Sequence, residues 1–92
     1  MKASLVVYNQ TGLDPYHKVL LSRALFGYTD NSNNNLYHYK RKGLLDSIPH
    51  VRLLKGAVII KIKDQKSLVS ILKKHKAELK VYDITVKPII FN

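Results

Sequence analysis

The segment AVIIKIK, Ala57–Lys63, carries the strongest β-strand pattern in the chain. Four of its seven residues are β-branched, and such side chains pack well on a pleated sheet. Alternation along a strand places Val58, Ile60 and Ile62 on one face, and Ala57, Ile59, Lys61 and Lys63 on the other. We therefore predict a central strand with one face covered by helices and one face open.

A second strand is predicted for SLVVYN, Ser4–Asn9, with Leu5 and Val7 facing the helices. In register, LVVYNQ and KGAVIIKI resemble the two signature strands of the RNA-recognition motif family. The open-face positions of those strands hold base-stacking aromatic rings in that family. This chain has Val6, Ala57 and Ile59 there. The resemblance therefore implies a similar fold pattern without a stacking platform on the sheet.

Two helices are predicted beside these strands. Asp14 is a good N-cap, Pro15 suits the first helical position, and Gly27 suits a helix end, so we expect a helix over Pro15–Phe26. We expect Tyr16, Leu20 and Ala24 on its buried side, with Val19, Leu21 and Leu25 as further candidates. A second helix, from Gln65 to about Lys76 and capped by Asp64, carries Leu68, Ile71, Leu72 and His75 on one face.

The remaining segments complete one domain over residues 1–92. Four of the five residues 31–35 are Asn, which indicates a flexible loop over 29–35. We expect strands at Leu36–Lys42 and Glu78–Lys87, a connector at Gly43–His50, and a C-terminal tail at 88–92. The resulting order is β-α-β-β-α-β. It predicts an α+β, ferredoxin-like fold in which a four-stranded antiparallel sheet carries both helices on one face.

Positive charge is abundant and unevenly distributed. The chain has 16 Lys and Arg against 6 Asp and Glu, a net charge of +10. Thirteen of the cations lie in residues 40–92, together with only four acids. Such a field attracts phosphate polyanions, whereas charge kept only for stability usually mixes both signs. We therefore expect a nucleic-acid partner, with RNA favoured over DNA.

The stretch YTDNSNNNLYHYKRKG, Tyr28–Gly43, leads into three consecutive cations. Tyr37, Tyr39 and Arg41 share one side of the expected strand, and rings beside Arg are typical of single-strand binding surfaces. Alternatively, Lys and Arg protect an edge strand from aggregation. The candidate phosphate contacts are Lys40, Arg41, Lys42, Arg52 and Lys55, with Tyr37 and Tyr39 for stacking and Lys61 and Lys63 as second-line contacts.

Two other classes of function stay open. A metal-free ribonuclease would use His38, Tyr37 or Tyr39 for proton transfer beside the cations. A protein-interaction module or homodimer would use the open sheet face or the C-terminal tail.

Several other features are expected to be missing. The chain has no cysteine, and its histidines lack metal-ligand spacing, so we expect neither a metal nor a cofactor. Its apolar runs are short and it lacks a signal-peptide pattern, so we expect a cytoplasmic protein that does not bind membranes.

Overall fold

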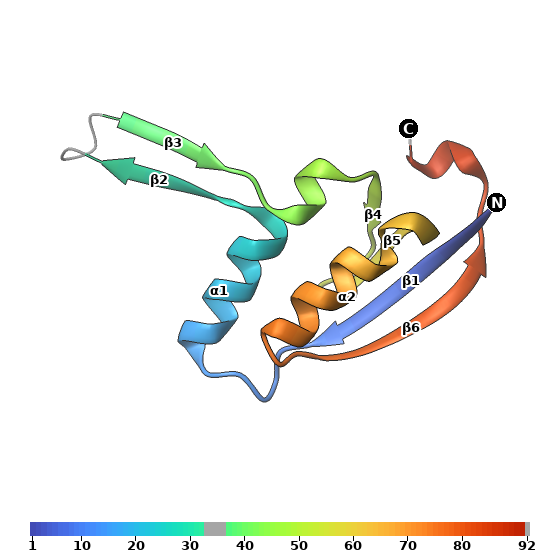
Figure 1. Cartoon of the computed structure of the whole chain (residues 1–92), viewed down its shortest axis with the longest axis horizontal. Helices are drawn as coiled ribbons and strands as arrows, with labels where there is room; N and C mark the ends of the chain where they lie inside the picture. The colour runs from blue at the N-terminus through green and yellow to red at the C-terminus, as the bar shows by residue number, and fades with distance from the viewer. Residues whose placement is uncertain (33–36, 92) are drawn as a thin grey trace.

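The computed structural model describes residues 1–32 and 37–91, and only the backbone of Asp30–Ser32, Tyr37 and His38. The architecture is α+β (Figure 1). The strands are β1 (Lys2–Asn9), β2 (Tyr28–Ser32), β3 (Tyr37–Arg41), β4 (His50–Arg52), β5 (Ala57–Lys61) and β6 (Glu78–Thr85). The helices are α1 (Pro15–Phe26) and α2 (Gln65–Lys74), with 3₁₀ turns η1 (Leu44–Ser47), η2 (Ile62–Asp64) and η3 (Pro88–Phe91).

A four-stranded antiparallel sheet forms the body, in the order β4-β5-β1-β6. Both helices pack against one face of this sheet, as Figure 1 shows. The core between the two layers is made by Val6, Val58 and Ile60 from the sheet, Leu21 and Leu25 from α1, Leu68 and Leu72 from α2, and the flanking Leu45 and Ala77. The predicted sheet with two helices is therefore confirmed at the level of an α+β fold.

The predicted facing of β1 is wrong. Val6 pairs with Val58 and Ser4 with Ile60, so Ser4, Val6 and Tyr8 face the helices. Leu5 lies on the open face together with Val7, which is 38% exposed. Ser4 is fully buried, and its hydroxyl donates a 2.7 Å hydrogen bond to Gln65 Oε1 at the start of α2. This bond gives the buried Ser4 hydroxyl a hydrogen-bond partner, so a polar residue expected at the surface can lie between the sheet and the helices.

The predicted order of elements also needs correction, because the described residues between the helices form four strands rather than two. β2 and β3 pair only with each other among the described residues and form a separate two-stranded sheet. We call this sheet, together with Lys42 directly after β3, the arm. Residues 29–32 of the predicted loop belong to β2, and 33–35 lie outside the described residues. The position beside β5 is taken by β4 instead of the 36–42 strand.

The base of the arm is a close approach of two backbones at Gly27 and Gly43. Gly27 has φ +75°, and a Cβ there would lie 2.1 Å from the Arg41 carbonyl oxygen. A Cβ on Gly43 would lie 2.4 Å from the Leu25 carbonyl oxygen. The amide of Gly43 donates a 2.9 Å hydrogen bond to Asp46 Oδ2 in η1. The arm can leave the body at this point because neither residue carries a side chain.

α1 has its predicted bounds and cap, since Asp14 Oδ1 accepts a 2.8 Å bond from the His17 amide. Of the residues expected on its buried side, Leu21 and Leu25 are fully buried, whereas the expectation for Tyr16 is wrong, because Tyr16 is 67% exposed. Asp64 makes no side-chain cap to α2, contrary to expectation. The predicted apolar face of α2 is confirmed, with Leu68 and Leu72 fully buried.

Candidate nucleic-acid interface

A pocket of about 300 Å³ lies where α1, the end of β1 and the β4–β5 turn meet. We call it the basic pocket. Its lining comprises Tyr8, Asn9, Gln10, Thr11, Lys18, Ser22, Phe26, Arg52, Lys55 and Gly56. Three of these residues are cations and none is an acid, although they come from three separate parts of the chain.

The β4–β5 turn brings Lys55 to the basic pocket. Leu54 accepts a 3.0 Å backbone bond from Ala57, which closes a tight turn with Lys55 and Gly56 at its two central positions. Gly56 has φ +88° at the third position of the turn, which glycine adopts most readily. The turn is attached to β1 because the Tyr8 amide donates a 2.8 Å bond to the Gly56 carbonyl.

The opposite wall is one face of α1. Lys18, Ser22 and Phe26 are spaced four residues apart, so their side chains follow one another along the helix. The Arg52 guanidinium lies over the Phe26 ring, 4.1 Å from the ring centroid. This cation–π contact positions Arg52 while leaving the edge of its planar guanidinium to donate hydrogen bonds.

Two polar groups at the end of β1 complete the lining. Tyr8 is half-buried, and burial raises the pKa of its hydroxyl while the nearby Arg52 charge lowers it to a smaller extent. The hydroxyl therefore stays protonated at neutral pH and can donate a hydrogen bond. Asn9 Oδ1 accepts bonds from both the backbone amide, at 2.8 Å, and the hydroxyl of Thr11. These bonds leave the Asn9 amide nitrogen as the donor for a ligand.

The cations of the basic pocket are not neutralised by neighbours. Among the described residues, Lys18, Arg52 and Lys55 are exposed and form no ion pair within 4.0 Å. Two other hollows in the described part of the chain each include an acid, Asp14 in one and Glu78 in the other. The basic pocket thus combines concave shape, uncompensated positive charge and several hydrogen-bond donors, which suits an anion.

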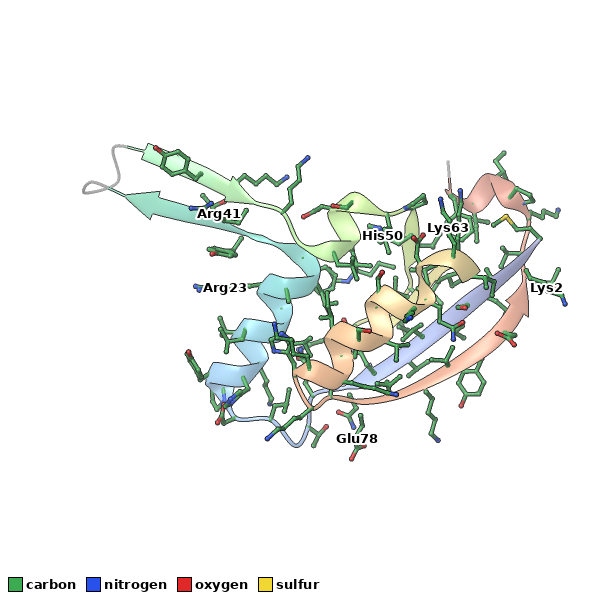
Figure 2. The ribbon with its side chains drawn as sticks, in the orientation of Figure 1. Lys2, Arg23, Arg41, His50, Lys63 and Glu78 are labelled. Atoms are coloured by element: carbon green, nitrogen blue, oxygen red, sulfur yellow. The ribbon has the colours of Figure 1, made fainter. Side chains whose placement is uncertain are left out.

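The arm carries a second group of cations. Lys40, Arg41 and Lys42 are exposed, and Tyr39 is 50% exposed. Arg41 lies opposite Tyr28, whose ring is covered by the Arg23 guanidinium at 4.6 Å. Figure 2 shows Arg23 and Arg41 near each other, at the junction of the arm and the body.

The predictions of base stacking and of ribonuclease activity partly depend on Tyr37 and His38. The side chains of these two residues lie outside the described part of the structure.

The predicted phosphate contacts therefore divide into two groups. Lys40, Arg41 and Lys42 belong to the arm, whereas Arg52 and Lys55 belong to the basic pocket, because β3 is not a neighbour of β4 in the sheet. Lys61 lies on the open face, and Lys63 lies in η2, on the far side of the body from Arg41 (Figure 2). The sequence interpretation missed Lys18, although its spacing with Ser22 and Phe26 was a usable signal.

The open face of the sheet is contacted at one end by the C-terminal tail. The Lys61 ammonium lies 5.9 Å from the Phe91 ring centroid in η3, and Ala3, opposite Lys61, is fully buried. Away from this end, Val7 and Tyr82 are 38% and 49% exposed. Homodimerisation through this face stays a prediction.

Comparisons with protein-family models, curated proteins and solved structures give no match to this chain. Within the described residues, no three His, Cys, Asp or Glu side chains gather as a metal site would require. None of the helices in the same residues has the length and apolar character needed to span a membrane.

Proposed function

We propose that this protein is a small cytoplasmic nucleic-acid-binding protein, with RNA favoured over DNA, that binds through electrostatic contacts with the phosphate backbone. The observation that carries the proposal is the basic pocket, where Lys18, Arg52 and Lys55 meet without a carboxylate. Lysine and arginine side chains bind phosphates by displacing counterions, and this displacement supplies most of the sequence-independent affinity.

The arm supports the same function. It extends away from the body in Figure 1 and adds three exposed cations to those of the basic pocket. Tyr39 is half exposed beside them, and an exposed ring can stack with an unpaired base. A strand of nucleic acid that contacts both regions would meet six cations, Lys18, Lys40, Arg41, Lys42, Arg52 and Lys55.

We also propose that the body is a ferredoxin-like domain into which the arm is inserted. Without β2 and β3, the remaining elements follow the order β1-α1-β4-β5-α2-β6. The antiparallel sheet order β4-β5-β1-β6 is compatible with that arrangement. β1 and β5 are the central strands, α1 lies between β1 and the edge strand β4 in the chain, and α2 lies between β5 and the edge strand β6.

Salt-dependent binding tests the proposed function. If all six cations contact phosphates of a single strand, log Kd changes with log salt with a slope of magnitude about 4. Reversing the arm charges in K40E/R41E/K42E removes three contacts, and we expect the slope to fall to about half. Fluorescence anisotropy with a short labelled RNA strand measures both slopes, and thermal unfolding checks that the variant is folded.

The matched control is K2E/K66E/K87E, which makes the same change in net charge at exposed lysines outside both regions. We expect it to retain most of the affinity and salt slope of the wild type. Equal losses in the two variants would show that net charge alone attracts the nucleic acid, and the proposed interface would be wrong.

The ribonuclease alternative predicts RNA cleavage in EDTA that disappears in His38→Ala.

A further inference from the structure

The basic pocket has features that a site for internal backbone phosphates does not need. It is a hollow bounded by residues 9–11 at the end of β1, by α1 and by the β4–β5 turn. An internal phosphodiester has a nucleotide on each side, so it binds most readily along an open groove. A terminal phosphate can instead enter a pocket end-on.

The basic pocket also carries more positive charge than one phosphodiester would neutralise. A phosphodiester carries a single negative charge, whereas a terminal phosphate monoester carries about −1.5 to −2 at pH 7 and presents three acceptor oxygens. Lys18, Arg52 and Lys55 supply three positive charges from α1, β4 and the β4–β5 turn. This excess of positive charge favours the monoester.

The donors around the pocket match a group with several acceptor oxygens. The Arg52 guanidinium, held against Phe26, can bind two oxygens at once through its planar fork. Tyr8, Asn9 and Ser22 also line the pocket, and their side chains carry hydroxyl or amide groups that can act as neutral donors. A site that offers several donors to one ligand discriminates against ligands that lack the oxygens to accept them.

We propose that the basic pocket binds the terminal phosphate monoester of a nucleic-acid strand while the arm contacts the backbone that follows. This inference rests on the proposed function and specifies the chemical group that the pocket recognises. It assigns different roles to the two groups of cations: the arm provides affinity for any strand, and the pocket provides preference for a phosphorylated end.

Binding of three versions of one short RNA strand tests this assignment. The strands carry a 5′-phosphate, a 3′-phosphate or hydroxyls at both ends. We expect one phosphorylated strand to bind the wild type about tenfold or more tightly than the unphosphorylated strand, because it adds charge-assisted hydrogen bonds. Lys18→Met, Arg52→Met and Lys55→Met keep an apolar stem but remove the charge, and each should lose this preference. The control Lys66→Met should retain it.

A titration observed by NMR provides a second measurement that does not depend on variants. Adenosine 5′-monophosphate should shift the backbone amides of residues 9–11 and 53–56, whereas adenosine should leave them unchanged. Shifts caused equally by both compounds, or by the monophosphate only outside these segments, would contradict the assignment. Equal affinity for all three RNA strands with a steep salt slope would also overturn it while leaving the proposed function intact. Absence of binding to these strands and to DNA strands of the same length would overturn both.

Discussion

The β4–β5 turn offers the sharpest test of how the basic pocket is built. Gly56→Ala places a Cβ at φ +88° and 2.6 Å from the Tyr8 carbonyl oxygen. The positive φ costs an alanine about 1–2 kcal/mol. The turn must also move by about 0.8 Å to reach ordinary contact at 3.4 Å, which weakens the bond from the Tyr8 amide to the Gly56 carbonyl. That bond contributes about 0.5–1.5 kcal/mol.

Together these effects predict a loss of about 1.5–3.5 kcal/mol in the free energy of unfolding, or roughly 6–28 °C in Tm for a domain of this size. Thermal unfolding followed by circular dichroism measures the shift. Gly12→Ala is the matched control, since its Cβ would meet no atom within 4 Å and its φ lies outside the left-handed range. We expect the control to change stability by less than about 1 kcal/mol. If the two variants had the same Tm, the proposed role of Gly56 would be wrong.

Two further predictions concern the core and the cap of α1. Leu72→Ala removes a fully buried side chain and should lower the free energy of unfolding in urea by about 2–5 kcal/mol, whereas Leu54→Ala, at a position 78% exposed, should change it by less than about 0.5 kcal/mol. Similar losses in both would contradict the assigned core. The pKa of Asp14 is held below its ordinary value of 3.8, first by the hydrogen bond from the His17 amide. Because the folded-state pKa is the lower one, the stabilisation is complete above 3.8 and is lost as the pH falls through the folded pKa. Asp14→Asn keeps a capping oxygen but does not titrate, so the difference in urea midpoint between it and the wild type should shrink at acid pH. A difference independent of pH would refute this.

Local interactions determined which parts of the fold the sequence predicted. α1 begins and ends where expected because the Asp14 cap, Pro15 and Gly27 act on the backbone within one turn of their own positions. The apolar face of α2 follows from side-chain spacing alone. Abundant cations with few acids are likewise a property of composition, so a polyanionic partner could be predicted before any fold was known.

The tertiary structure decided three other features, each of which depends on residues far apart in the chain. The run LVVY is apolar at every position, so its pattern does not select a face, and pairing of Val6 with Val58 sets the facing of β1. β2 contains Asp30, Asn31 and Ser32, residues of low strand propensity, and it forms through pairing with β3. Lys18 joins Arg52 and Lys55 because α1 packs beside the β4–β5 turn, and sequence spacing does not report the distance between such separated segments.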